Sequence, residues 1–561
     1  MEFFYSKNKN FNSLPGVHLL QDHIGSGHTS PWDDYGFVTT FKTYYVENSE
    51  ATLLGEIKVL ADGSNDTSKY FAQHGIELKS SSDSLNITSC LLSEKVVSLP
   101  IKNEYYERLH SLLSTDRIEQ YLNGICDAGY FIDNYEIYVN WKGFSLSLVR
   151  DGQSAEARIK KGYRIALGNY SPDPVVEISI ETLGNTFEPI SFAFNNEKGQ
   201  NNSNINLLIG ANGTGKSHIL KHVTELLTGL AQGNEIWPYF HKLIVVAYSP
   251  FENFYSNKEL AESLAKSKSE GESLKGQLTT TRIKRLQKIN KYSYVGFKNN
   301  AGSFNTDWPP EYSIQCILQI LDYDEENRWK ESSRLELLVN TLQLSVKFDH
   351  LAIKLRSGEI LPLETGSQYI QAHARKNELD LKSGIHFIRN GVPVPLSSGQ
   401  KIYSYIMPAL VSEIERESLI ILDEPELYLH PTLEVGLITM LRSVLSETNS
   451  YALIATHSAI LAREVKSKGI RILRKKENST AVSLPTFETY GESLDRILGE
   501  AFGDYETPKP YQSDISNIIE HCPTPSEALK LVGNVGDEAL TYVLSRFSDS
   551  SDEIEIEIEA P

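Results

Sequence analysis

The sequence predicts an α/β protein whose central part is a sheet of buried parallel strands covered by helices. Three apolar runs support this: Ile205–Ile209, Leu419–Leu422 and a run ending at Ala455. Each is short and is followed by glycine, acidic or polar residues, which is typical of strands buried on both faces. We expect a helical insert within this part, an α+β accessory domain before it and a small helical region after it.

Length and composition limit the function classes. A chain of 561 residues is too long for one core, and 40% apolar with 23% charged residues is typical of folded domains. No apolar run approaches the roughly 18 residues that span a bilayer, and residues 1–13 lack an apolar signal core, so we expect a cytoplasmic protein without a membrane partner. The wide spacing of four cysteines argues against disulfides and zinc, and a net charge of −19 argues against nonspecific coating of DNA.

The accessory domain is predicted over residues 1–170. Gly36–Val46 and Ala51–Ala61 are rich in β-branched and aromatic residues and predict a strand pair. Glu104–Cys126 has helical spacing, and Ile137–Arg150 is interpreted as another hairpin. We find no group of chemically reactive residues here, which favours an accessory or interaction role.

The head is predicted over residues 175–480, after a break at Ser171–Asp173. Val175–Phe194 predicts a hairpin that turns at Gly184-Asn185, and Asn390-Gly391 is a strong hairpin signal. The insert is expected at roughly 256–385.

Within the insert, Glu259–Lys291 predicts an exposed helical arm and Arg328–Leu344 another helix. Beyond the head, residues 481–548 predict short helices that dock a partner or pack on the head. Residues 549–561 form an acidic tail, for which disorder is the default expectation.

A glycine-rich turn directly follows the first apolar run. It consists of Gly210, Ala211, Asn212, Gly213, Thr214, Gly215, Lys216 and Ser217, the Walker A pattern. Its glycines let backbone N–H groups face phosphate oxygens at the start of a helix. We expect Lys216 to reach the β and γ phosphates of ATP and Ser217 to ligate Mg²⁺.

The second apolar run ends in two neighbouring acids, Asp423 and Glu424. At the end of a buried strand, Asp423 is placed to hold Mg²⁺ and Glu424 to polarise the attacking water as the catalytic carboxylate. The third run ends at Thr456-His457, and His457 is predicted to contact the γ-phosphate.

The pentapeptide Leu396–Gln400 (LSSGQ) precedes a helix predicted from Gly399 to about Glu415. Ser397, Ser398, Gly399 and Gln400 would cap a nucleotide held by a second copy of the chain, with Ser398 and the helix start facing its γ-phosphate. The order of these four motifs resembles the heads of ABC-type ATPases. That resemblance implies two heads clamping two ATP molecules in a homodimer or higher oligomer.

The segment Asp423–Pro431 (DEPELYLHP) narrows the resemblance to the soluble branch of ABC ATPases, which includes RecF-like and overcoming-lysogenization-defect-like proteins. Lys291–Asn299, Phe387–Gln400 and Pro485–Asp504 are similar to Septu-type defence ATPases (PtuA-like), including retron-associated versions. The expected glutamine of the Q-loop is missing from Lys242–Phe254.

The Septu resemblance implies a regulatory ATPase of an antiviral complex. Its partners would be an HNH nuclease (PtuB-like) in trans and, in retron-encoded versions, a reverse transcriptase with its multicopy single-stranded DNA. Two alternatives remain open: a RecF-like DNA repair or recombination clamp, and a slow ATP-gated assembly scaffold.

Overall fold

The computed structural model describes residues 1–547, apart from 12–13, 27–28, 35, 79–80, 151–152, 174, 182, 184–185, 196–202, 232–237, 272–290, 331, 364–374, 478 and 504–508. Three predicted features therefore lie partly or wholly outside the described residues. They are the turn at Gly184-Asn185, the helical arm beyond Gly271 and the acidic tail 549–561.

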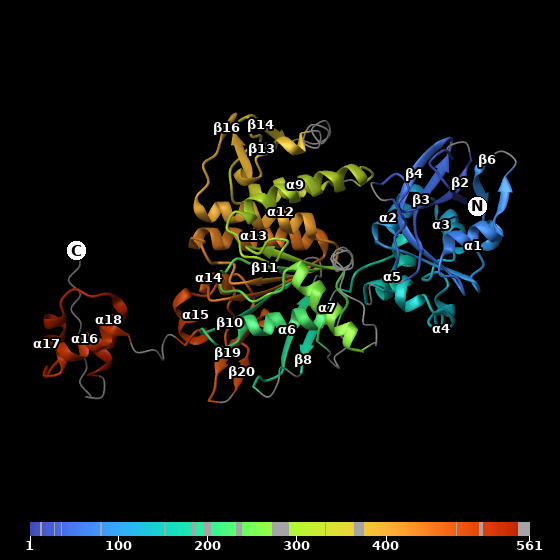
Figure 1. Ribbon diagram of the computed structural model, residues 1–561. Helices are drawn as coiled ribbons and strands as arrows, with labels where there is room; N and C mark the ends of the chain where they lie inside the picture. Colours follow the sequence, from blue (N-terminus) through green and yellow to red (C-terminus); the bar gives the residue numbers. More distant parts are fainter. Residues whose placement is uncertain are drawn as a thin grey trace.

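The N-terminal domain is a seven-stranded sheet with helices packed against it (Figure 1). Its strands, in the spatial order β5-β6-β1-β2-β3-β4-β7, are β1 (Phe3–Ser6), β2 (Gly16–Gln21), β3 (Thr40–Glu47), β4 (Glu50–Ala61), β5 (Ile76–Leu78), β6 (Ser81–Asn86) and β7 (Val96–Pro100). Its helices are α1 (Thr67–His74), α2 (Glu104–Leu112), α3 (Thr115–Gly124), α4 (Tyr135–Tyr138) and α5 (Gln153–Ala166). The predicted strand pair is confirmed as antiparallel β3 and β4.

The hairpin predicted at Ile137–Arg150 is wrong. This stretch contains the end of α4 and a π-helical turn, Phe144–Leu148. Tyr138, Trp141 and Phe144 recur at helical spacing and are buried together in one cluster with residues of β4 and β7. Burial of this helical face outweighed the β propensity of its aromatic residues.

The head contains a second seven-stranded sheet, in the order β12-β11-β17-β18-β10-β19-β20, parallel except for the edge strand β20. These strands are β10 (Ile205–Gly210), β11 (Leu243–Ala247), β12 (Tyr292–Gly296), β17 (Leu419–Asp423), β18 (Tyr451–Thr456), β19 (Ile470–Lys475) and β20 (Thr480–Ser483). The head helices are α6 (Lys216–Thr228), α7 (Asn257–Gly271), α9 (Trp308–Glu326), α10 (Arg334–Gln343), α12 (Ser398–Glu413), α13 (Pro431–Thr448), α14 (Ala459–Arg463) and α15 (Leu494–Ala501). The predicted α/β fold is confirmed.

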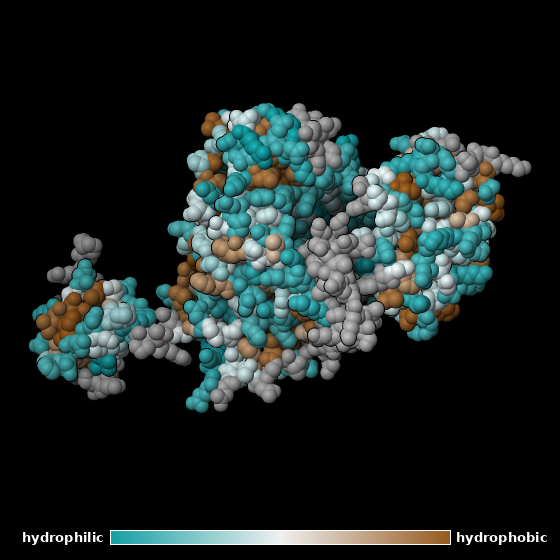
Figure 2. Space-filling model, viewed as in Figure 1, coloured by the Kyte–Doolittle hydropathy of each residue, from teal (hydrophilic) through white to brown (hydrophobic). Residues whose placement is uncertain are grey.

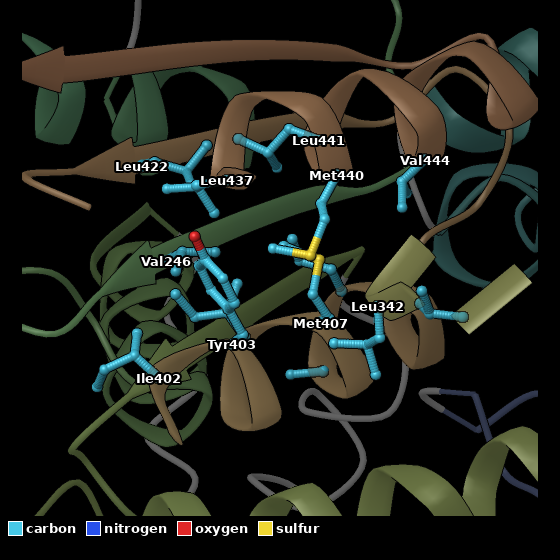
Figure 3. Close-up of a cluster of buried hydrophobic side chains, with 14 of the residues drawn as sticks. Val246, Leu342, Ile402, Tyr403, Met407, Leu422, Leu437, Met440, Leu441 and Val444 are labelled. Atoms are coloured by element: carbon cyan, nitrogen blue, oxygen red, sulfur yellow. The ribbon is translucent and has the colours of Figure 1, made fainter. Parts of the chain in front are cut away.

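Alternate residues along the strands belong to two separate cores, one on each face of this sheet. Ile420 and Leu422 of β17 belong to the core with α9, α10, α12 and α13, whereas Leu419 and Ile421 belong to the core with α6 and the hairpin β8 (Val175–Ile180) and β9 (Ile190–Asn195). A run such as LIIL is uniformly apolar because both faces are covered. Figure 3 shows the first core, where Met407 and Met440 meet between α12 and α13.

The insert is not purely helical, which corrects the prediction for residues 256–385. It contributes β12 to the edge of the main sheet, and β13 (His350–Lys354) and β14 (Ile360–Leu363) to a separate four-stranded sheet. That sheet is completed by β15 (Ile385–Arg389) and β16 (Val392–Pro393), joined at Asn390-Gly391 as predicted. Both turn residues have positive φ, 51° and 75°, which this dipeptide adopts readily.

The C-terminal region divides into two parts. Helix α15 packs into the head, with Ile497 and Ala501 buried in its core. The helices α16 (Pro510–Ile519), α17 (Pro525–Val532) and α18 (Asp537–Ser545) form a small cluster of their own, set apart from the head in Figure 1. Figure 2 shows apolar surface on these helices, where Ile518 and Leu531 are exposed. Partner docking by this region stays a prediction.

Helices α2 and α5 join the N-terminal domain to the head. Glu107 on α2 pairs with Lys330 at 2.8 Å, and Lys161 on α5 pairs with Glu417 at 2.6 Å. The hydroxyl of Tyr170 also donates to Glu417 at 2.8 Å. Glu417 is buried and lies two residues before β17, so the domain interface holds the start of the strand that leads to Asp423 and Glu424. Among the described residues, no helix is both long and apolar enough to cross a membrane.

His241 is expected to make this interface sensitive to pH. Asn103 donates to its Nδ1 at 2.7 Å, and burial lowers the pKa of the imidazole from 6.5 to about 4. The unfolded chain therefore binds a proton that the folded chain excludes, so this contribution to stability is complete above pH 6.5 and is lost as the pH falls toward 4. In calorimetry, the stability advantage of the unmodified chain over His241→Gln should shrink between pH 7 and about 4.5. A difference in stability that stays constant with pH would contradict the lowered pKa of His241. The control is His521→Gln, because His521 is exposed.

Candidate nucleotide-binding site

Parallel pairing brings the predicted motifs to one edge of the head sheet. In the register, Ile209 on β10 lies beside Thr456 on β18, and Asp423 on β17 lies beside Ala455 on β18. The carboxyl ends of β10, β17 and β18 are therefore neighbours, although long stretches of chain separate them. Ligand sites of open parallel sheets form at such carboxyl ends.

The turn Gly210–Ser217 has the backbone geometry of a phosphate-binding loop. Gly210, Gly213 and Gly215 have positive φ values of 151°, 78° and 96°. Around Gly213 a Cβ would meet no atom within 4 Å, so the loop centre is open. Gly215 caps the start of α6, whose first N–H groups and positive dipole end face the same loop.

Lys216 is buried and lies at the centre of the site. Its ammonium donates to the carbonyl oxygens of Gly210 at 3.0 Å and Ala211 at 3.3 Å, and lies 2.7 Å from Nε2 of His457. A phosphate entering the loop would offer its oxygens in place of these acceptors. Burial lowers the pKa of Lys216, and the carboxylate of Glu424 partly opposes this effect.

His457 and Glu424 lie side by side, with Nε2 3.2 Å from Oε1. Burial and the charge of Lys216 lower the pKa of His457, which favours a neutral ring whose Nε2 accepts from Lys216. Glu424 is half-buried and has a left-handed backbone, with φ of 48°. Its backbone N–H donates to the Ala455 carbonyl at 2.9 Å, so β18 fixes the turn that carries this carboxylate.

Ser217 and Asp423 form the predicted metal pair. The Ser217 hydroxyl donates to Oδ1 of Asp423 at 2.9 Å. Burial raises the pKa of Asp423 to about 6, an effect that the Ser217 hydrogen bond opposes. The side-chain atoms of Ser217 and Asp423 that could ligate a metal are oxygens, which Mg²⁺ prefers. Two protein ligands are sufficient when phosphates and waters complete the coordination shell. The pair therefore fits a Mg²⁺ ion, which would neutralise phosphate charge there.

The pentapeptide Leu396–Gln400 is called the signature here, and the phosphate-binding loop Gly210–Ser217 is called the P-loop. Among the described residues, no hydrogen bond joins the signature to the P-loop of the same chain. Ser397 and Gln400 cap their own helix: Ser397 accepts from the Gln400 N–H at 3.3 Å, and Gln400 Oε1 accepts from the Ser397 N–H at 3.0 Å. Ser398 is exposed at the first position of α12. Gly399 is buried, and a Cβ there would lie 2.5 Å from Cδ1 of Leu433. Ser398, at the start of α12, is therefore open to solvent in the single chain.

Two residues beside the site were not assigned a role from the sequence. The ring of Phe187, just before β9, stacks on His218 at 5.6 Å and covers Gly215. No sequence pattern marks Phe187, because its position depends on how the β8–β9 hairpin packs on α6. Glu426 accepts hydrogen bonds from the loop that carries His457. It stands within the motif DEPELYLHP, but only the structure shows its partners.

Comparisons with known proteins cover a part of the head in one case and most of the chain in another. Residues 321–463 match the family model described as "AAA domain, putative AbiEii toxin, Type IV TA system", an interval that includes Ser398, Asp423, Glu424 and His457. The chain is 24% identical over 547 residues to Protein ea59 of Escherichia phage lambda, covering 91% of this chain and 92% of that protein.

Similar solved structures include the SMC head domain from Thermotoga maritima, with a TM-score of 0.27, 12% identity and coverage of 56% of this chain and 100% of that chain. Another is an SmcHead bound to the C-winged helix domain of ScpA, with a TM-score of 0.26, 13% identity and coverage of 55% and 96%.

Replacement of Gly215 by alanine should disable the loop. The new Cβ would lie 2.6 Å from the Phe187 ring, at a φ of 96° that side-chain-bearing residues rarely adopt. We expect ATP affinity, measured with a fluorescent analogue, to fall at least tenfold, about 1.4 kcal/mol. Gly358→Ala is the matched control, because Gly358 has φ of 93° but open space around it. Equal losses of affinity in both variants would contradict the geometry.

Proposed function

We propose that this chain binds ATP with Mg²⁺ at the carboxyl edge of the head sheet and hydrolyses it between two copies of itself. The observation that carries the proposal is the convergence of Lys216, Ser217, Asp423, Glu424 and His457 at this edge. A lysine in a glycine-rich loop, an oxygen pair for Mg²⁺ and a half-buried carboxylate beside them are the parts that phosphoryl transfer to water requires.

Each side chain has a distinct task in this proposal. Lys216 and the loop N–H groups orient the β and γ phosphates. Glu424 accepts a proton from the attacking water, and its half-buried position beside His457 keeps it accessible to that water. His457, within reach of both Lys216 and Glu424, contacts the γ-phosphate and reports its loss. Ser217 and Asp423 hold Mg²⁺.

A second copy would complete the site, because among the described residues the signature makes no hydrogen bond to the P-loop of its own chain. Ser398 is exposed, and a helix of 16 residues begins at it, so its N-terminal dipole favours an anion supplied from outside. A γ-phosphate bridging two heads would hold them together, and its hydrolysis would loosen them. Nucleotide state would then control the assembly.

We further propose that this cycle controls a nuclease supplied in trans, within an anti-phage defence complex. The Septu-like segments Lys291–Asn299, Phe387–Gln400 and Pro485–Asp504 support this setting. The partner would be an HNH nuclease, joined in retron-associated systems by a reverse transcriptase with its single-stranded DNA. The separate helices α16–α18, with their exposed apolar residues, are the candidate docking region.

Glu424→Gln should separate binding from hydrolysis. The amide keeps the shape of the side chain but cannot accept the proton of the attacking water, so we expect phosphate release to fall about 100-fold or more with ATP affinity retained. Light scattering should show a dimer that accumulates with ATP. Adding Ser398→Arg should prevent this dimer without loss of ATP binding. Wild-type turnover in Glu424→Gln would contradict the role of Glu424, and a dimer that survives Ser398→Arg would contradict the two-copy site.

Phage challenge tests the cellular role. The chain is co-expressed with its genomic neighbours, and protection is measured as plaque efficiency. We expect Lys216→Ala to abolish protection, because its ammonium is the cation placed to reach the phosphates. Lys475→Ala, an exposed lysine on β19, should leave protection intact. Full protection by Lys216→Ala would exclude ATP control of the complex.

A further inference from the structure

Two carboxylates that follow β17 hold the loop that follows β18. Oε1 of Glu426 accepts from the hydroxyl of Thr456 at 2.7 Å and from the backbone N–H of His457 at 2.6 Å. Glu434 on α13 accepts from the hydroxyl of Ser458. The loop carrying His457 is therefore fixed by side chains from the same segment that carries Glu424.

Glu426 differs from an ordinary surface acid. Burial raises the pKa of its carboxyl group, and the hydrogen bonds from Thr456 and His457 oppose this effect. Its second oxygen, Oε2, is buried and has no hydrogen-bond partner among the described residues. Apart from the backbone N–H of Glu426 itself, the donors to this carboxylate are Thr456, the last residue of β18, and His457, the residue after it.

The side-chain hydrogen bonds of Glu426 link it to the reacting groups through His457. The N–H that Glu426 accepts is that of His457 itself, whose ring lies 2.7 Å from Lys216 Nζ and 3.2 Å from Glu424 Oε1. A shift of this backbone would change both distances together. Displacements of about 1 Å in such arrangements can lower turnover by about 100-fold.

We propose that Glu426 is a positioning residue that sets the place of His457 in the site through the reach of its side chain. The inference rests on the proposed ATP hydrolysis. Glu426 contributes by geometry, because its Oε1 accepts from Thr456 and His457 and, among the described residues, it makes no hydrogen bond to the P-loop. Its Thr456 bond fixes the direction of the carboxylate, and its His457 bond fixes the backbone.

Two conservative variants separate reach from charge. Glu426→Gln keeps the reach and one accepting oxygen but loses the charge, whereas Glu426→Asp keeps the charge and is one methylene too short. We expect Glu426→Gln to retain turnover within about threefold and Glu426→Asp to lose about 10- to 100-fold, as for other groups that orient a functional side chain. ATP affinity should stay within about threefold in both variants, because the P-loop is untouched.

A double-mutant cycle shows whether the effect passes through His457. In a His457→Ala background, Glu426→Asp should cause no further loss of turnover, because the residue that it positions is gone. Glu488→Asp is the matched control, since Glu488 accepts from the backbone N–H groups of Ser467 and Tyr490 at 2.9 and 3.0 Å without contacting the site. This control should keep wild-type turnover.

The outcomes distinguish this inference from the proposed function. An unmodified chain that releases no phosphate would contradict the hydrolysis itself. The inference would be overturned if the unmodified chain hydrolyses ATP, Glu426→Asp stays active and Glu426→Gln is inactive. The charge of Glu426, and not the reach of its side chain, would then be what hydrolysis requires. Additive losses in the cycle would overturn the route through His457. Crystal structures give a readout independent of turnover: the 456–458 loop should shift in Glu426→Asp, and an unmoved loop would overturn the inference.

Discussion

The parallel pairing of β17 between β11 and β18 is the constraint on which the rest of the site depends. It places Asp423 beside Ala247 on one side and Ala455 on the other, so the acidic pair leaves the sheet where β18 also ends. The strand is apolar on both faces and is covered on both, so a shift in register would draw the acidic pair between the two apolar cores or displace apolar residues from them. The same burial that stabilises the head therefore fixes the position of Glu424 and His457.

Charge is concentrated where the strands end. Lys216 is buried near Asp423, Glu424 and Glu426, and these three carboxylates oppose the lowering of its pKa by burial. Glu424 and Glu426 in turn add to the effect of burial in raising the pKa of Asp423. Buried charges are tolerated only when they are paired or hydrogen-bonded. Here the pairing is incomplete: Lys216 relies on backbone carbonyls and His457, and one oxygen of Glu426 has no partner among the described residues. Such an arrangement suits a polyanion with a divalent cation, which would supply the missing counter-charges.

The backbone stores strain in the same segment. Glu424 and Tyr428 have left-handed conformations, with φ of 48° and 74°, each costing on the order of 1–3 kcal/mol for a residue with a side chain. Hydrogen bonds hold this turn in place, including those from Glu424 N–H to Ala455 and from Leu429 N–H to Glu426. At its far end the segment packs on the signature helix, since the Tyr428 carbonyl lies 3.2 Å from the Cβ position of Gly399. One strained turn therefore touches both the candidate catalytic residues and the signature.

The sequence by itself determined the local chemistry: the P-loop, the acidic pair after LIIL, the helix at LSSGQ and the Asn390-Gly391 turn are contiguous patterns whose backbone geometry depends on the residues within them. Only the tertiary structure decided which residues meet. Glu426 contacts Thr456 and His457 across about 30 positions, and Phe187 covers Gly215 from a separate hairpin. The helical turns at Tyr138–Leu148 and the strands of the insert also depended on distant partners. Side-chain burial and strand pairing are contributed by residues far along the chain, so no local pattern specifies them.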